Sequence, residues 1–561
     1  MLAPAATGGG RYGGRLPRGA AATGGGCYDG RPLRWGGAGR KVGCGLKWSQ
    51  LVTRAGLVTR WDGSVDPEIT SVVEDSRQAG LGSCFVAVRG TRADGHGFVE
   101  AACQAGAAAV VCERPVKAIP GVAVLQLASA RGVVGRLAAV LYGLDERLRS
   151  GRLNVVGVTG TNGKSTFCYL MQAILRQAGY PTAMLGTVQY DLVSRTIESG
   201  WTTPPAATLM GYLAEAAEAG ATHAVMEVSS HALDQGRCDG VRFAVGVFSN
   251  LTGDHLDYHE TMESYLRAKK RLFDGLDANA VAVVNAEDPA GRRIVADCQA
   301  SVLWYGIASG DDAVGGRSAE RDVEARIERI AATGSRFELT SRWAVGRGHS
   351  ASPVSRWIDS ALVGRHNVQN CLAAASAALG LGIGLDTIAA GLDSVRCVPG
   401  RLQRVEGTGR ACTVLVDYAH TDDALENVLS AVRPLATRRL IVMFGCGGDR
   451  DKSKRPRMAA VVAKYADRIV VTSDNPRTEE PEAIIADILP GFDAAAMRRV
   501  TVESDRRAAI GQAIAMAEAD DVVVLAGKGH ETYQEIGRQR VPFDDVVVAG
   551  ERLKVTGERG G

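Results

Sequence analysis

The glycine-rich stretch that decides the fold reads Thr159-Gly160-Thr161-Asn162-Gly163-Lys164-Ser165-Thr166. A buried strand is predicted at 154–158 just before it, and the apolar spacing of 167–178 predicts a helix just after it. In such a strand–loop–helix unit, glycines let backbone N–H groups approach a phosphate, and the helix N-terminus adds positive potential. We expect Lys164 to contact the terminal phosphates and the Ser165 hydroxyl to meet Mg²⁺. The stretch therefore predicts a nucleotide site.

This loop departs from the common phosphate-loop pattern at one position. The pattern G-x-x-x-x-G-K-[ST] would place its first glycine at 158, where this chain has valine. Glycine stands at 157 and 160 instead. A chance glycine turn is the alternative interpretation, and the strand and helix patterns on either side argue against it.

Length and composition indicate a globular protein of several domains. The chain has 561 residues, 46% of them apolar and 23% charged, and no apolar run reaches the roughly 18 residues of a membrane span. The net charge of +3 is concentrated at 1–46, where seven Arg or Lys accompany one Asp. The remainder is mildly acidic and gives no reason to expect a nucleic-acid partner. Twelve scattered cysteines without a C-x-x-C pair predict reduced thiols in a cytoplasm.

Composition and periodicity divide the chain into four segments. Residues 1–46 are rich in Gly, Ala and Arg and are predicted to be a disordered extension; translation from an upstream start codon is the alternative. A small α/β domain is expected at 47–150 and a central α/β domain at 151–397, which includes strands and loops at 302–360. A second α/β unit is expected at 398–561.

The central segment carries three further candidate features. The predicted strand at 222–227 ends in Glu227, a natural Mg²⁺ partner beside a phosphate loop, although a helix cap or a solvated carboxylate would look the same. The run 254–259 has the Asp and His of a metal site, and these side chains could equally cap the following helix. Lys269 lies in a basic run whose ordinary role is a solvated helix face.

Four strand-like runs of the last segment, at 414–416, 440–444, 468–471 and 522–525, each lead into a polar loop. In a parallel sheet these loops meet at one edge, where such folds bind ligands. Arg450 and Arg477 in two of the loops suit carboxylate recognition, and solvated surface arginines would fit the pattern as well. The loop after 444 is not G-x-G-x-x-G, so a dinucleotide is not expected.

Five motifs occur in one order along the chain: the 159–166 loop, the 227–231 run, the 254–259 run, the Lys269 segment and the 527–531 run. Together they closely resemble the Mur ligases of peptidoglycan synthesis and, within that family, the MurE ligases that add the third residue of the stem peptide. The resemblance runs from about Leu46 to the end, and the family's T-G-T-N-G-K-[ST] loop accounts for Val158. It implies three α/β domains: an N-terminal UDP-sugar-binding domain, a central P-loop-type ATP-binding domain and a C-terminal Rossmann-like domain that binds the amino acid.

The resemblance implies a specific reaction. ATP, the co-substrate, phosphorylates the glutamate side of UDP-MurNAc-L-Ala-D-Glu to an acyl phosphate, and the amine of meso-diaminopimelate attacks it to give an amide, ADP and phosphate. A cytoplasmic monomer with Mg²⁺ as cofactor is expected. Lys164, Glu227, His255 and Lys269 are the implied catalytic residues. Lys269 aligns with the family's carbamylated lysine (N6-carboxylysine), and with Ser165, Glu227 and His255 it would form the metal shell.

The resemblance also assigns the binding residues of each substrate. The implied ATP contacts are Gly160, Thr161, Asn162, Gly163, Lys164, Ser165, Thr166, Asn367, Asn370, Arg401 and Asp417. The implied contacts of the UDP-linked dipeptide are Ser76, Thr91, Arg92, Ala93, Thr202, Thr203, Ser229, Gln235 and Arg237. The implied diaminopimelate contacts are Arg450, Asp474, Asn475, Pro476, Arg477, Gly527 and Glu531. Trp201 departs from relatives that carry a polar residue before the two threonines.

The run D-N-P-R at 474–477 resembles that of the diaminopimelate-using enzymes. Lysine lacks the distal carboxylate, so Arg477 is expected to remain unpaired with lysine, at a cost of a few kcal/mol. Three alternatives stay open at this point. One is a MurE-type ligase that adds L-lysine. Another is a ligase like folylpolyglutamate synthase, which would lack the N-terminal domain and the D-N-P-R run. The last is a nucleotide-binding regulatory module, which would need no amino-acid site.

Overall fold

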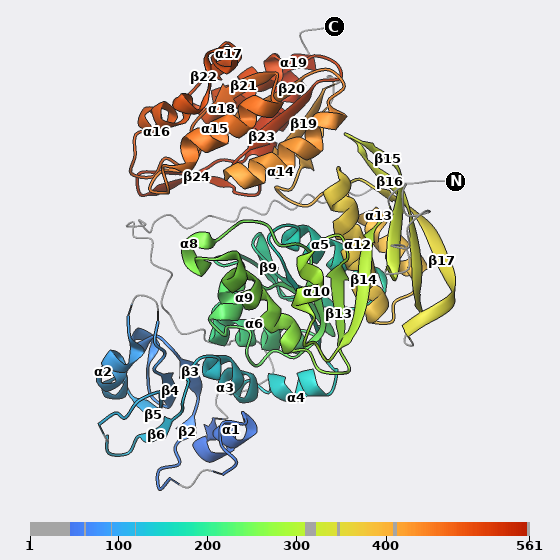
Figure 1. Cartoon of the computed structure of the whole chain (residues 1–561). Helices are drawn as coiled ribbons and strands as arrows, with labels where there is room; N and C mark the ends of the chain where they lie inside the picture. Colours follow the sequence, from blue (N-terminus) through green and yellow to red (C-terminus); the bar gives the residue numbers. More distant parts are fainter. Residues whose placement is uncertain are drawn as a thin grey trace, which may run out of the picture.

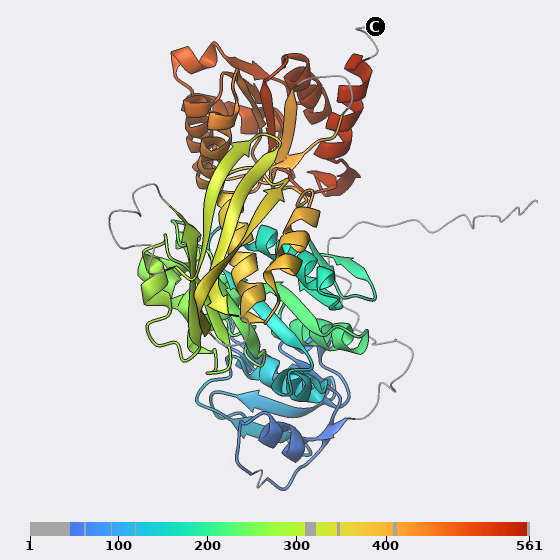
Figure 2. The same cartoon turned by 90° about the vertical axis from the view of Figure 1, so that its right-hand side faces the viewer.

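The computed structural model describes residues 45–60, 63–90, 93–117, 119–308, 321–344, 348–407 and 412–557. The predicted contacts Thr91 and Arg92, and the predicted extension up to residue 44, lie outside these ranges. Three α/β units follow one another along the chain and are stacked end to end, from blue through green to red in Figure 1. The second view shows the same order (Figure 2). The predicted three-unit α/β fold is confirmed.

The N-terminal unit is built on a four-stranded parallel sheet, in the order β3-β4-β5-β6. Its elements are β1 (Leu46–Lys47), α1 (Trp48–Arg54), β2 (Glu68–Ile69), β3 (Ser71–Val73), β4 (Ser83–Val86), α2 (Val99–Gln104), β5 (Ala107–Cys112), β6 (Ala123–Gln126), α3 (Val133–Leu141) and α4 (Leu144–Arg149). Trp48 and Leu51 of α1 and Leu137 of α3 are fully buried in one shared core beneath this sheet. Both helices therefore cover the same face.

The central unit contains an eleven-stranded sheet with the order β10-β9-β8-β11-β7-β12-β13-β14-β15-β16-β17. Its strands are β7 (Asn154–Thr159), β8 (Thr182–Leu185), β9 (Gln189–Asp191), β10 (Thr196–Glu198), β11 (His223–Glu227), β12 (Phe243–Phe248), β13 (Val281–Asn285), β14 (Ser301–Ile307), β15 (Val323–Ala331), β16 (Gly334–Ala344) and β17 (Gly348–Ser360). Strand β7 lies between β11 and β12 and is parallel to both. The loops that follow these three strands therefore open at the same edge.

Helices cover both faces of this sheet. They are α5 (Lys164–Gln177), α6 (Ala206–Glu218), α7 (Ser230–Asp234), α8 (Leu256–His259), α9 (Met262–Asp274), α10 (Ala290–Ile294), α12 (Arg365–Gly380) and α13 (Leu385–Ser394). Helices α5, α12 and α13 share one apolar core, which includes Phe167, Leu372 and Ile388. Helices α6 and α9 contribute to a second core with Leu213 and Leu272. The phosphate loop thus leads into α5, and α5 packs against α12 and α13.

The C-terminal unit has a six-stranded sheet in the order β18-β19-β23-β20-β21-β22. Its elements are β18 (Gln403–Arg404), β19 (Thr413–Asp417), α14 (Asp422–Val432), β20 (Leu440–Phe444), α15 (Lys454–Tyr465), β21 (Arg468–Val471), α16 (Pro481–Ile488), α17 (Ala494–Met497), β22 (Val500–Val502), α18 (Arg506–Ala515), β23 (Val522–Ala526), β24 (Tyr533–Ile536), β25 (Gln539–Pro542) and α19 (Asp545–Gly557). Strands β19, β23, β20 and β21 are mutually parallel, as predicted. Their following loops meet at one edge.

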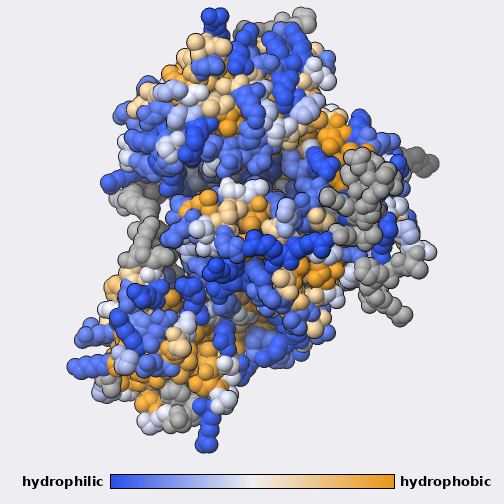
Figure 3. Space-filling view, in the orientation of Figure 1, coloured by the Kyte–Doolittle hydropathy of each residue, from blue (hydrophilic) through white to orange (hydrophobic). Residues whose placement is uncertain are grey.

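The predicted boundaries at 150 and 397 fall between α4 and β7 and between α13 and β18. Across the second junction, Ala332 from the β15–β16 turn packs against the apolar core of the C-terminal unit. The face shown in Figure 3 is mainly hydrophilic, with apolar residues in small groups. In the part of the chain that the structure describes, no helix combines the length and the apolar character that a membrane crossing requires.

Candidate functional site

The phosphate loop connects β7 to α5, as the sequence predicts. Gly160 and Gly163 have φ angles of +152° and +89°, which favour glycine. A Cβ atom at Gly160 would lie 1.9 Å from Ser249 Oγ, and one at Gly163 would lie 2.3 Å from Asn370 Oδ1. The loop is therefore in close contact with the loop after β12 on one side and with α12 on the other.

The Lys164 side chain folds back onto the phosphate loop. Its Nζ donates hydrogen bonds to the backbone oxygens of Gly160, at 3.0 Å, and of Thr161, at 2.8 Å. Burial lowers the pKa of Lys164, and the nearby Glu227 carboxylate opposes that shift. Because its hydrogen-bond acceptors in the described residues are neutral carbonyls, the ammonium is available to an anionic phosphate.

Glu227, at the end of β11, is 2% exposed and faces the start of α5. Its Oε1 accepts hydrogen bonds from Ser165 Oγ and from the Thr187 backbone N–H, both at 2.8 Å, and its Oε2 accepts one from Thr187 Oγ1 at 3.1 Å. The alternative of a solvated carboxylate is therefore wrong. A hydroxyl beside a carboxylate next to a phosphate loop is an oxygen donor set that fits Mg²⁺.

The side chains of the 254–259 run do not form a metal site by themselves. Across the described ranges, no three His, Cys, Asp or Glu side chains gather as a possible metal cluster. The ring of His255 lies 4.9 Å from that of His231 and 6.2 Å from that of Tyr265. Burial is the main cause that lowers the pKa of His255, which favours the neutral imidazole that can bind a metal.

Lys269 is buried, so the alternative of a solvated helix face is wrong for this residue. It lies on α9 with 1% of its surface exposed, and its Nζ donates to Gly160 O at 2.8 Å. The Nζ also lies 4.3 Å from the centre of the Tyr265 ring. Burial lowers the pKa of Lys269 far below its ordinary value, and the like charge of Lys164 lowers it further. The amine thus lies against the phosphate loop.

The remaining predicted ATP contacts surround the loop from two elements. Asn370 Nδ2 donates to Asn367 Oδ1 at 3.0 Å on α12, and both side chains are buried. Arg401, in the linker before β18, donates from Nη2 to Ser165 Oγ at 3.3 Å. The Asp417 carboxylate accepts from the backbone N–H groups of Leu402 and Ala419 at 2.7 and 2.8 Å. It therefore fixes the linker that carries Arg401.

The predicted contacts of the UDP-linked dipeptide that belong to the central unit form a connected group beside Glu227. Thr203 Oγ1 donates to Glu227 O at 2.8 Å and accepts from the Ser229 N–H at 3.0 Å. Arg237 donates to Gln235 Oε1 at 2.6 Å and to Thr203 O at 3.0 Å. The hydroxyls of Thr187 and Thr202 share a hydrogen bond of 3.0 Å, and the Trp201 ring centre lies 5.0 Å from the Arg237 guanidinium carbon. Ser76 belongs to the N-terminal unit, where it begins a short 3-10 helix at 76–78.

The predicted diaminopimelate residues meet where β21 and β23 end. Arg477 Nε donates to Glu535 Oε2 at 2.9 Å, and its Nη1 donates to Gly448 O at 2.8 Å. Asn475 Nδ2 donates to Glu531 Oε2 at 2.8 Å. The others follow these loops: a Cβ at Gly527 would lie 2.4 Å from Asp474 Oδ2, a Cβ at Gly448 would lie 1.9 Å from Pro476 O, and Arg450 is exposed.

Three residues that hold these groups in place were not predicted from the sequence. Thr187 fixes Glu227, and Lys528 donates to Asn475 Oδ1 and Glu531 Oε2, both at 2.9 Å. Glu535 pairs with Arg477, so the expectation that Arg477 has no partner without a substrate carboxylate is wrong. Lys528 lies inside the 527–531 motif and could have been named, whereas Glu535 and Thr187 stand in no recognisable pattern.

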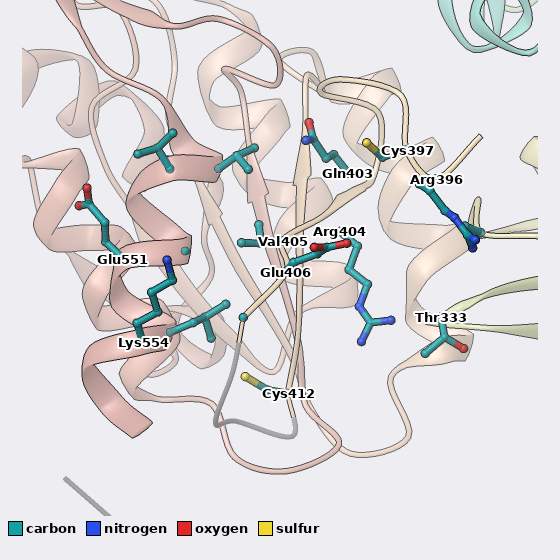
Figure 4. A pocket seen from close by; sticks show the side chains of 16 residues that line it. Thr333, Arg396, Cys397, Gln403, Arg404, Val405, Glu406, Cys412, Glu551 and Lys554 are labelled. Atoms are coloured by element: carbon teal, nitrogen blue, oxygen red, sulfur yellow. The ribbon is translucent and has the colours of Figure 1, made fainter. Parts of the chain in front are cut away.

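A cavity of about 950 Å³ lies away from these groups, at the junction of the central and C-terminal units. Figure 4 shows its walls, which come from the linker residues around Arg396, from β18 with Arg404 and from α19 with Lys554. None of the predicted site residues lines it. The cavity is therefore separate from the candidate active site.

Comparison with known families covers all three units. The Mur ligase middle domain matches residues 158–378, the Mur ligase glutamate ligase domain matches 400–529, and the Mur ligase family catalytic domain matches 68–140. These matches include the phosphate loop, Glu227, Lys269 and the D-N-P-R run within their bounds. Each unit of the fold thus has a counterpart in the same family.

Similar proteins cover almost the whole chain. Proteins named UDP-N-acetylmuramoyl-L-alanyl-D-glutamate--2,6-diaminopimelate ligase are 43% identical in Geobacter sulfurreducens, over 88% of this chain and 97% of the relative, and 45% identical in Parasynechococcus marenigrum, over 88% and 96%. A solved structure titled with the same ligase name is 32% identical with a TM-score of 0.64, over 91% of this chain and 99% of the other. The chain belongs to the Mur ligase family.

Proposed function

We propose that this protein is an ATP-dependent ligase that joins meso-2,6-diaminopimelate to UDP-MurNAc-L-Ala-D-Glu. The products are the UDP-MurNAc-tripeptide, ADP and phosphate, and the reaction supplies a peptidoglycan precursor. The observation that carries the proposal is the meeting of the phosphate loop, Glu227 and buried Lys269 at one edge of the central sheet. Relatives above 40% identity that bear this ligase name support the choice of substrates.

Phosphoryl transfer needs positioned charge more than covalent chemistry. Lys164, whose hydrogen-bond acceptors among the described residues are both backbone carbonyls, stabilises the terminal phosphates, and backbone N–H groups of the 160–166 loop orient them. Ser165, Glu227 and His255 would hold Mg²⁺, which neutralises charge that develops on the transferred phosphoryl group. Arg401 reaches the same helix start from the linker and adds a cation when the C-terminal unit is in this position.

Lys269 is proposed to carry an N6-carboxy group. The neutral amine would attack CO₂ to form a C–N bond, one C=O π bond would break with its electron pair moving to oxygen, and one proton would leave the nitrogen for solvent. The product is an anion beside Lys164, where it would offset positive charge and supply an oxygen ligand for a second Mg²⁺. The complete burial of the Lys269 amine, with no carboxylate bonded to it among the described residues, supports this modification.

The incoming amino acid is proposed to bind between the loops after β20, β21 and β23. The guanidinium groups of Arg477 and Arg450 would bind its distal carboxylate, and Glu531 with Asp474 would bind its distal ammonium. The free amine at the other end would then attack the acyl phosphate and displace phosphate. One chain supplies every residue of this scheme, so we infer that a monomer suffices. We further infer that it acts in the cytoplasm, where ATP and nucleotide-linked sugars are available.

Omission of single substrates tests the proposal. Phosphate release should require ATP, UDP-MurNAc-L-Ala-D-Glu and meso-diaminopimelate together, and each omission should reduce it to background. ATP binding without substrate-dependent ADP formation would instead support a regulatory module. Phosphate release with a folate and glutamate, but not with the UDP-linked dipeptide, would overturn the choice of substrates.

A further inference from the structure

The Arg477 side chain is held by the hairpin β24–β25 and by the loop after β20. Glu535 on β24 accepts a hydrogen bond from Arg477 Nε at 2.9 Å, and Gly448 O accepts from Nη1 at 2.8 Å. Among the described residues, Nη2 has no acceptor within hydrogen-bond distance. Two of the three guanidinium nitrogens are therefore fixed by the protein, and the edge formed by Nη1 and Nη2 keeps N–H groups for another ligand.

The same hairpin also fixes the Arg477 backbone. Arg477 has a φ of +52°, in the left-handed region that a residue with a side chain adopts only at a cost. Its N–H donates to Glu535 O at 3.0 Å, and its carbonyl accepts from the Gly537 N–H at 2.7 Å. These two backbone hydrogen bonds hold Arg477 in an unfavourable conformation, and residues held in this way are often found at functional sites. The direction of the side chain thus depends on the hairpin.

We propose that Glu535 is a positioning residue for the amino-acid substrate, which orients the guanidinium of Arg477 so that its Nη1–Nη2 edge meets the distal carboxylate of diaminopimelate. The inference rests on the proposed function and deepens it, because it names what sets the selectivity of that site. A planar guanidinium that is held in place loses little conformational entropy when a carboxylate binds across two of its nitrogens. Without Glu535, Arg477 can rotate and the bidentate geometry is lost.

The other oxygen of Glu535 is also bound within the hairpin. Arg540 Nε donates to Glu535 Oε1 at 3.2 Å, and the Arg540 guanidinium lies 4.2 Å from the centre of the Tyr533 ring. Arg540 is 57% exposed on its side chain, so its pairing contributes little. Glu535 and Arg477 are only 24% and 23% exposed, so their contact is the stronger link. Glu535 therefore acts on the substrate chiefly through Arg477.

Steady-state kinetics of Glu535→Ala test this inference. The KM for meso-diaminopimelate should rise about tenfold to hundredfold, the range expected when a charge-assisted hydrogen bond is removed. The KM values for ATP and for the UDP-linked dipeptide should stay within twofold. Selectivity for diaminopimelate over L-lysine should fall, because lysine has no distal carboxylate for Arg477 to bind. Glu535→Gln keeps an acceptor for Nε and should fall between the wild type and Glu535→Ala.

Two controls separate positioning from folding. Gln539→Ala changes an exposed side chain on β25 that has no hydrogen bond or ion pair to Arg477 among the described residues, and it should leave all three KM values unchanged. The double variant Glu535→Ala/Arg477→Ala should behave like Arg477→Ala alone, since Glu535 acts through Arg477. A merely structural role would give additive losses and would also change the KM for ATP.

The outcomes distinguish this inference from the function on which it rests. A wild-type enzyme that does not use diaminopimelate would overturn both. A wild-type enzyme that uses it, together with a Glu535→Ala variant whose diaminopimelate KM is unchanged, would overturn the positioning role alone. Additive effects in the double variant would have the same consequence.

Discussion

Replacement of Gly163 by alanine should weaken ATP binding specifically. Gly163 has a φ of +89°, and a Cβ there would lie 2.3 Å from Asn370 Oδ1. An unfavourable backbone angle of this kind costs about 1–3 kcal/mol for a residue other than glycine, and the clash must be relieved by moving the loop or Asn370. Both belong to the candidate ATP site. If the strain is relieved there, the KM for ATP should rise roughly 5- to 150-fold.

Gly179 offers a matched control at the other end of the same helix. Its φ is +82°, but nothing lies within 4 Å of a Cβ at that position. Gly179→Ala therefore carries a similar backbone strain without the clash, far along the chain from the loop. It should lower the melting temperature and leave the KM for ATP unchanged.

The measurement is phosphate release at varied ATP, with both other substrates saturating, beside thermal unfolding of each variant. An unchanged ATP KM in Gly163→Ala would refute the placement of the phosphates on the 160–166 loop. Equal increases in Gly163→Ala and Gly179→Ala would show that general destabilisation, and not the loop geometry, causes the loss.

Three other variants test separate parts of the account. Lys269→Ala should lose most of its activity and regain part of it with a short carboxylic acid that replaces the carbamate; no regain in an activity assay would count against the modification. Arg506→Met leaves the fully buried Asp545 carboxylate, now 2.6 Å from its partner, without a counter-charge, so urea unfolding should show a loss of about 3–5 kcal/mol; a loss under 1 kcal/mol would contradict this. Hydrogen bonds, first from Arg455, lower the pKa of Glu479 from 4.5 to about 2, so its contribution to stability is present above pH 4.5 and is lost as the pH falls toward 2. Glu479→Gln should therefore be less stable than the wild type at pH 7, with the difference shrinking at pH 3, and a constant difference in urea unfolding would refute the assignment.

Local patterns predicted the parts of the fold in which one short segment carries the information. The strand, loop and helix around Lys164 appear in the structure as β7 and α5, and the four apolar runs of the last segment are parallel strands. Such features depend on spacing within about fifteen residues. These strands and this helix could therefore be predicted from periodicity and glycine positions alone.

Contacts between distant segments left no such signal. Arg401 meets Ser165 across 236 residues of sequence, and Glu535 meets Arg477 across 58. Lys269 shows the limit most clearly, because a lysine within a charged run is ordinarily solvated, yet here the fold buries its side chain completely. Only the family resemblance singled it out. The sequence thus supplied candidate members of the site, while the contacts between them, and residues such as Glu535, depended on the tertiary fold.

A competition experiment tests the central claim most directly. The purified protein is given ATP, Mg²⁺, UDP-MurNAc-L-Ala-D-Glu and equal concentrations of meso-diaminopimelate and L-lysine, and the products are identified by mass spectrometry. The account predicts a UDP-MurNAc-tripeptide that ends almost entirely in diaminopimelate, with one ADP formed for each product. A tripeptide that ends in lysine, or equal amounts of both, would contradict it.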